Sequence, residues 1–148
     1  MNLPKIVLAL GYSGLIPFFI GPVWLGLSPE TAPAWLDRAW LSWAALIGAF
    51  MAGTFWGFAL PAVQGPAGLL GIFISVALVA LTGIAVTLEF AHALAGLALV
   101  FMLLLLADFW RERTLDTIGG YFRLRSTLTA GVLIAITWRY LMLPAGGA

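Results

Sequence analysis

Most of the charge in this chain lies in one stretch, DFWRERTLDTIGGYFRLR, which runs from Asp108 to Arg125. The whole chain has seven basic and six acidic residues, and this stretch holds seven of those thirteen. They are Asp108, Arg111, Glu112, Arg113, Asp116, Arg123 and Arg125. Guanidiniums grouped in this way can pair with carboxylates, lipid phosphates or acidic groups of a partner protein.

Asp108 follows the apolar run LLLLA, where a carboxylate is costly unless it is paired or solvated. The natural partners are Arg111, Arg123 and Arg125. A pair between Asp108 and Arg125 would clamp the apolar run before the charged stretch to the one after it. We therefore expect a stabilising ion pair here and no catalytic acid.

Glu89 and His92 form a second pair of reactive types, three positions apart, so they would share a face of a continuous helix. A carboxylate and an imidazole could relay a proton or supply part of a metal site. Two ligands do not complete a metal site, however, and both residues fall at an expected turn, where polarity costs little. We predict a structural or solvated pair.

Arg139 lies near the end of the last apolar run, between two aromatic residues that are typical of a membrane interface. It can extend to lipid phosphates, or it can form an internal ion pair. The acidic candidates for that pair are Glu30, Asp37 and Glu89. The sequence leaves both alternatives open.

No arrangement typical of an enzyme is found in the sequence. The chain has no cysteine, which excludes disulfides, thiolate catalysis and iron–sulfur ligation. Paired carboxylates, a serine–histidine arrangement, a metal-binding cluster and a nucleotide-binding loop are also missing. We predict that the protein is not an enzyme and has neither a cofactor nor a metal site.

The composition indicates what surrounds these residues. Hydrophobic residues make up 63% of the chain, charged residues 9%, and the mean hydropathy is +1.08. Soluble proteins have about 25% charged residues, so this chain cannot cover a core with a charged shell. We predict an integral membrane protein with one all-helical domain, residues 1–148.

The apolar runs predict a bundle of five transmembrane helices, each long enough to cross a hydrocarbon core of about 30 Å. The spans are about 6–27, 39–62, 68–88, 91–110 and 125–143. The basic residues at one end of these spans would be Lys5, Arg111, Arg113, Arg123 and Arg125. Only Arg38 and Arg139 would lie at the other end, so we predict a cytoplasmic N-terminus and a C-terminus outside.

Small residues recur at helical spacing in two of the spans. Ala49, Gly53 and Gly57 are four apart and predict a flat stripe along which another helix can approach closely. That helix could belong to this chain or to another protein. Gly11 and Gly14 predict a similar helix-packing position in the first span. Pro17 follows them and should kink this helix near Ser13.

Three motifs together resemble a family of small, uncharacterised inner-membrane proteins: GYSGLIPFF, GAFMAGTFWG and GGYFRLRSTLT, the last of which follows Asp108 and includes Tyr121. That family occurs in proteobacteria and has an animal relative, transmembrane protein sixty-nine, associated with mitochondria. The resemblance implies a five-helix fold and the bacterial inner (plasma) membrane as location. This chain departs from the family at Phe55, where relatives usually have a histidine.

We expect an accessory, structural or assembly subunit of a larger membrane complex, for example a respiratory or photosynthetic one. The expected partners are membrane lipids and other integral membrane subunits, and no nucleic acid. The small-residue stripes support this interpretation, and so does the charged stretch from Asp108 to Arg125, which we expect to form a basic hairpin between the fourth and fifth spans. The alternative is a binding or transport module for a lipid, a quinone or another small hydrophobic molecule.

Overall fold

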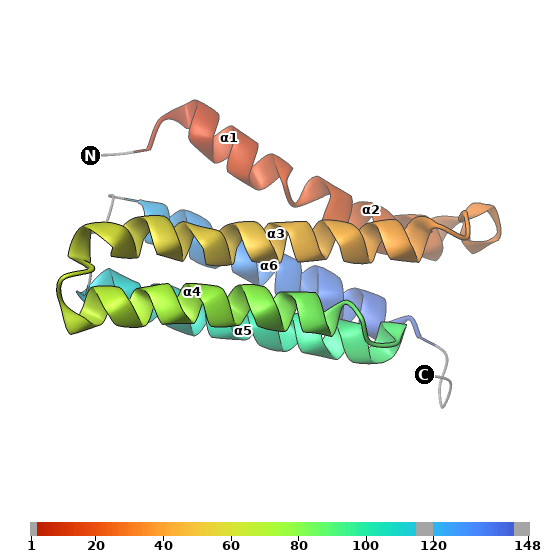
Figure 1. Ribbon diagram of the computed structural model, residues 1–148. Helices are drawn as coiled ribbons and strands as arrows, with labels where there is room; N and C mark the ends of the chain where they lie inside the picture. Colours follow the sequence, from red (N-terminus) through yellow and green to blue (C-terminus); the bar gives the residue numbers. More distant parts are fainter. Residues whose placement is uncertain (1–2, 115–119, 144–148) are drawn as a thin grey trace.

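The computed structural model describes residues 3–114 and 120–143, and within these ranges it contains helices and no strand (Figure 1). The predicted all-helical class is confirmed. The long helices are α1 (Lys5–Ser13), α2 (Ile16–Leu27), α3 (Leu36–Ala59), α4 (Pro66–Ala85), α5 (Phe90–Thr114) and α6 (Tyr121–Leu141). Two short 3₁₀ turns, η1 (Pro29–Thr31) and η2 (Leu60–Ala62), lie at the two ends of α3.

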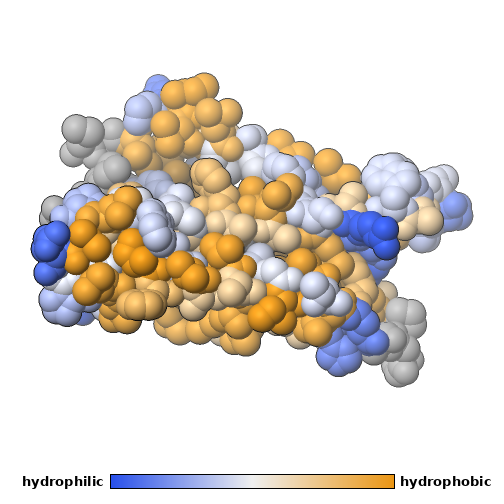
Figure 2. Space-filling model, in the orientation of Figure 1, coloured by the Kyte–Doolittle hydropathy of each residue, from blue (hydrophilic) through white to orange (hydrophobic). Residues whose placement is uncertain are grey.

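Four helical segments are long and apolar enough to cross a membrane: Lys5–Leu27, Leu36–Ala62, Pro66–Ala85 and Phe90–Thr114. α6 has 21 residues, which suffices for a fifth crossing, although its three arginines lower its hydropathy. Hydrophobic residues cover most of the visible face, and the hydrophilic residues gather at its two ends (Figure 2). This distribution is the one expected for a bundle surrounded by lipid.

The chain runs along the bundle five times, so the two ends of the described chain lie at opposite ends of the bundle (Figure 1). We call the end at which α5 stops and α6 starts the hairpin end, and α1 begins at the same end. α3 packs most extensively on α4, and α5 on α6. The segment α1 diverges from α3 towards the hairpin end, so the first pass is only partly integrated in the bundle.

The first pass is broken into α1 and α2 at Gly14 and Leu15. Pro17 lies in the first turn of α2, where its missing N–H would have no partner within that helix. The predicted kink is therefore a short interruption at the expected place. Two indole groups of α3 hold it: Trp40 donates to the carbonyl of Phe18 (2.8 Å), and Trp43 to that of Gly14 (3.1 Å).

α3 and α4 approach closely because small residues lie between them. A Cβ added at Gly48 would lie 3.3 Å from a side-chain carbon of Thr82. One turn further on, the hydroxyl of Ser75 donates to the carbonyl of Ala52 at 2.8 Å. Such short-side-chain contacts replace the hydrophobic effect as a source of helix association within lipid.

Candidate functional site

A buried ion pair joins α5 to α6 near the hairpin end. Nε of Arg125 donates to Oδ2 of Asp108 at 2.9 Å, and both side chains are almost completely buried. The two residues form the clamp that the sequence suggested. Asp108 lies in the second-last turn of α5 and Arg125 one turn into α6, so the antiparallel helices bring them together.

The same guanidinium also binds α3. Nη2 of Arg125 donates to the carbonyl oxygen of Met51 at 2.9 Å, and Nη1 donates to the hydroxyl of Thr54. Nη1 also lies 3.4 Å from the hydroxyl of Tyr121. Arg125 therefore ties three helices together, and nothing in the sequence singled out Met51 or Thr54 for this role.

Arg111 is the largest fully buried side chain among the described residues. Its guanidinium carbon is 4.5 Å from the ring centroid of Phe58 and 5.5 Å from that of Tyr121. Its Nε is 3.9 Å from Oδ1 of Asp108, which is too long for a hydrogen bond. Within residues 3–114 and 120–143, neither Oδ1 of Asp108 nor any of the three guanidinium nitrogens of Arg111 has a hydrogen-bond partner.

We call Asp108, Arg111, Arg125 and Tyr121 the charged cluster. Two guanidiniums and one carboxylate give it a formal charge of +1 in a region from which water is largely excluded. Isolated charge in such surroundings is expensive, and aromatic faces compensate only part of the cost. The arrangement is therefore suited to binding one further negative or hydrogen-bond-accepting group.

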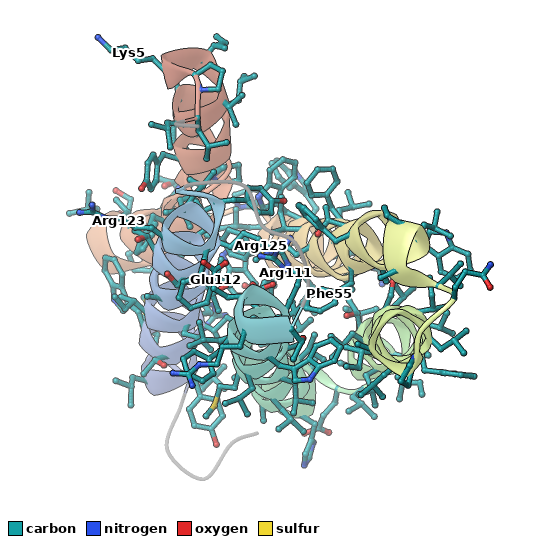
Figure 3. All side chains as sticks on the ribbon, turned by 90° about the vertical axis from the view of Figure 1, so that its left-hand side faces the viewer. Lys5, Phe55, Arg111, Glu112, Arg123 and Arg125 are labelled. Atoms are coloured by element: carbon teal, nitrogen blue, oxygen red, sulfur yellow. The ribbon has the colours of Figure 1, made fainter. Side chains whose placement is uncertain are left out.

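Other charged residues of the predicted hairpin lie outside the charged cluster. Arg123 and Lys5 point away from the bundle when it is viewed from the hairpin end, whereas Arg111 and Arg125 lie in its middle (Figure 3). Arg113 is exposed and extends over the ring of Phe109, 4.4 Å from its centroid. The stretch that the sequence presents as one patch thus divides into an inner and an outer set.

Phe55 contacts the charged cluster. It is fully buried, and its ring centroid is 5.8 Å from the guanidinium carbon of Arg125 and 6.0 Å from that of Arg111. A phenyl ring supplies a π face to both cations and no hydrogen-bond acceptor. Phe55 therefore offers the donors of Arg111 no hydrogen-bond acceptor on this side.

A cleft opens next to the charged cluster between the broken first pass, α3 and α6. Its volume is about 130 Å³. The walls are apolar, with Leu10, Phe18, Ile47 and Leu128 among them, and the polar side chains that line it are those of Tyr121 and Arg125. The cleft thus connects the lipid-facing side of the bundle with two hydrogen-bond donors.

The predicted small-residue positions fall in different surroundings. A Cβ added at Gly53 or Gly57 would meet no atom of the described residues within 4 Å, and both glycines are exposed, next to the half-buried Ala49. A Cβ added at Gly11 would lie 3.3 Å from Leu124, which marks the close contact of α1 with α6. Gly14 lines the cleft at the helix break.

At the other end of the bundle, Arg139 forms an internal ion pair. Its Nη2 is 2.9 Å from Oδ2 of Asp37, its Nε is 3.2 Å from Oδ1, and the contact ties α6 to α3. Of the alternatives that the sequence left open, the structure contains the pair with Asp37. Bidentate geometry of this kind is the stronger form of an arginine–carboxylate contact.

Glu89 and His92 lie at this same end and contact each other at 3.2 Å. Their side chains are 56% and 69% exposed. In the described ranges no group of three residues suited to hold a metal ion is found. The pair is therefore a surface contact between Glu89, which directly precedes α5, and His92 in the first turn of that helix.

Comparisons with curated proteins and with solved structures gave no match. A comparison with protein-family models gave one over almost the whole chain, from residue 3 to residue 141. The matched region includes every residue of the charged cluster and of the cleft. The chain belongs to the family described as "Protein of unknown function (DUF3429)".

Proposed function

We propose that the protein is an accessory, structural or assembly subunit of a larger membrane complex, for example a respiratory or photosynthetic one. The observation that carries this proposal is the outward face of α3 around Gly53 and Gly57, where an added Cβ would meet no atom within 4 Å. Large side chains flank this face, with Phe50 70% and Trp56 45% exposed. Large and small residues side by side form the ridges and grooves into which another helix can pack.

The contacts within the chain support the same proposal. α3 uses the small residues Gly48 and Ala52 to pack on α4, whereas none of the described residues packs against the adjoining glycines Gly53 and Gly57. A glycine in a lipid-facing helix contributes no side-chain packing and lowers helix propensity by about 1 kcal/mol. A second membrane protein that approaches the α3 backbone closely would offset this cost.

The charged cluster and its cleft favour a second candidate function. A buried ionisable group within a membrane span marks a functional site by default, because its burial is costly. The alternative is therefore a binding or transport module for a lipid, a quinone or another small hydrophobic molecule. The two roles concern adjoining surfaces of the bundle, since Phe50 flanks the outward face of α3 and also lines the cleft.

Gly53→Leu tests the proposed docking face. We expect the variant to accumulate and fold normally, because nothing contacts this position, and to lose most of its co-purifying membrane protein. The measurement is quantitative mass spectrometry of what co-purifies from native membranes in a mild detergent. Ala130→Leu is the matched control, since it enlarges an exposed small residue of α6 and should leave co-purification unchanged.

Normal co-purification of the Gly53→Leu variant would contradict docking through α3. If the variant failed to fold, Gly53→Ala would serve instead, because it adds a single carbon in open space. Loss of partners in a folded Gly53→Ala variant would support the proposal. Full retention of the partners in every folded variant at this position would refute it.

We further propose that the protein is a multi-pass protein of the bacterial inner (plasma) membrane, with the hairpin end facing the cytoplasm. The support is the excess of five basic residues over two at that end, which the positive-inside rule relates to the cytoplasmic side. The resemblance noted above supports this location. It also supports a wider family that includes proteobacterial members and the mitochondrial transmembrane protein sixty-nine.

Single cysteines can test this orientation because the chain has none of its own. Ser28→Cys lies at the end away from the hairpin, and Thr114→Cys lies at the hairpin end. Thr117, which the sequence places in the middle of the hairpin, lies outside the described residues, so Thr114 is used instead. We expect a membrane-impermeant maleimide to label Ser28→Cys in intact spheroplasts and Thr114→Cys only after lysis. The reverse pattern, or labelling of both from the same side, would contradict the orientation.

A further inference from the structure

We infer that the cleft binds an amphiphile with an anionic oxygen group, and that Arg125 and Tyr121 hold this oxyanion beside the charged cluster. The inference rests on the second candidate function and not on the docking role, because it concerns a ligand of the cleft, which shares Phe50 with the docking face. The ligand class is an acyl chain that ends in a carboxylate or a phosphate.

The first step is the count of hydrogen-bond donors. A guanidinium has five N–H groups, and those of Arg125 make four contacts: one from Nε, two from Nη1 and one from Nη2. One N–H of Nη2 is left over. The hydroxyl of Tyr121 lies 3.4 Å from Nη1, and its own proton has no acceptor among the described residues. Two residues that line the cleft therefore each retain a donor.

The second step is the balance of charge. Asp108 compensates one of the two buried guanidiniums, and Arg111 makes no hydrogen bond within the described part of the chain. The guanidinium carbons of Arg111 and Arg125 are 5.5 and 5.6 Å from the ring centroid of Tyr121. A monoanion at the Tyr121 hydroxyl would thus lie near both cations and neutralise the charged cluster. A neutral ketone, quinone or alcohol would leave the excess charge uncompensated.

The third step is the shape of the cleft. Its volume of about 130 Å³ is close to that of a cavity of about 150 Å³ that binds benzene. It has room for a carboxylate and the first few methylene groups, between apolar walls that include Phe18 and Val132. Leu10 and Phe50 also line it and are 66% and 70% exposed, so the remaining chain can continue into the surrounding lipid.

The test uses parinaric acid, a fluorescent fatty acid that accepts excitation energy from tryptophan, and its uncharged methyl ester. The purified full-length chain has seven tryptophans as donors. We expect saturable energy transfer with the acid and at least about tenfold weaker binding of the ester, because an ion pair contributes more than a neutral hydrogen bond. Equal binding of acid and ester would overturn the proposal.

Competition distinguishes the two sources of the oxyanion. Oleate offers a carboxylate, and oleoyl lysophosphatidate offers a phosphate on the same chain. If oleate displaces the probe at a lower concentration than the lysophosphatidate does, the site is assigned to a free fatty acid. Preferential displacement by the lysophosphatidate would assign it to a phospholipid, and displacement by neither would refute an oxyanion site.

Variants connect the binding to these residues. Ile47→Phe fills the cleft and should abolish transfer, whereas Leu46→Phe, one position away on the lipid-facing surface, should bind as the wild type does. Tyr121→Phe removes one donor and should weaken binding about three- to tenfold. Arg111→Met removes the excess charge without touching the cleft, and should weaken binding of the acid at least about tenfold but not that of the ester.

Circular dichroism and a single gel-filtration peak establish that each variant is folded. If Ile47→Phe did not fold, the folded Tyr121→Phe and Arg111→Met variants would still decide the matter. Unchanged affinity of the acid in both would overturn the inference. Because the measurement needs no partner complex, its failure would leave the docking proposal unaffected.

Discussion

Asp108→Ala is expected to lower the free energy of unfolding by about 3–5 kcal/mol, because breaking a buried pair leaves an uncompensated charge. In this bundle it leaves two charges, those of Arg111 and Arg125. It also removes the acceptor for Nε of Arg125, which lies 2.9 Å from Oδ2 of Asp108. The loss should appear as a lower midpoint in SDS titration of the protein in micelles, followed by circular dichroism.

A second substitution separates the charge effect from the loss of side-chain volume. Replacing Arg111 by Met in the Asp108→Ala background removes one of the stranded charges, and we expect it to recover about half of the loss. Arg113→Gln is the control outside the charged cluster. Because Arg113 is exposed, the change should shift stability by about 0.5 kcal/mol or less. A shift as small as this for Asp108→Ala would show that the pair does not hold the helices together.

Gly21→Leu is expected to detach α2 from α3. A Cβ added at Gly21 would lie 2.7 Å from Cδ1 of Trp40, closer than side chains pack. Trp40 cannot move away without losing its hydrogen bond to the carbonyl of Phe18 and its edge-on contact with the Phe18 ring, at 5.8 Å between centroids. Overpacking and the lost hydrogen bond together predict a destabilisation of about 2–4 kcal/mol.

Tryptophan emission is the measurement for this variant, because the Trp40 indole is buried and should become exposed to a more polar environment. Gly26→Leu is the matched control in the same helix, since a Cβ there would meet no atom within 4 Å. We expect the Gly26→Leu control to unfold at the same SDS concentration as the wild type. A red shift of emission in the control and none in Gly21→Leu would contradict the packing of α2 on Trp40.

The sequence predicts the passes of the bundle well, because long apolar runs bounded by charges and glycines have few alternatives in lipid. It also identifies Asp108 as a residue in need of a partner, since the cost of a carboxylate after LLLLA follows from local context alone. The choice of Arg125 depends on the antiparallel packing of α5 on α6. The sequence alone could therefore limit the partner of Asp108 to a few arginines but could not choose among them.

The contribution of α3 to the charged cluster has no signal in the sequence. Thr54 and the Met51 carbonyl lie more than sixty residues from Arg125 and have ordinary types for a membrane helix. The divergence of α1 from α3 is equally hidden, because a glycine and a proline predict a break but not its direction. The cleft depends on that direction, and so it could not be predicted.

Arg123 and Arg125 show the same limit at short range. The pattern treats them as equal members of a basic hairpin, yet two positions on a helix differ by about 200° in direction. Arg125 therefore enters the bundle and Arg123 faces outwards (Figure 3). Only the neighbouring helices decide which of the two is a structural residue and which is available to lipids or partners.

The proposed role in a larger membrane assembly can be tested on the protein as it is extracted from its membrane. The most direct test is the size of the particle that contains it after extraction from native membranes in a mild detergent, measured by native electrophoresis with mass spectrometry of the band. We predict a stoichiometric complex far larger than the 15.8 kDa chain in its micelle. Recovery of the wild-type chain solely as a monomer, with no other protein in constant ratio, would contradict the claim.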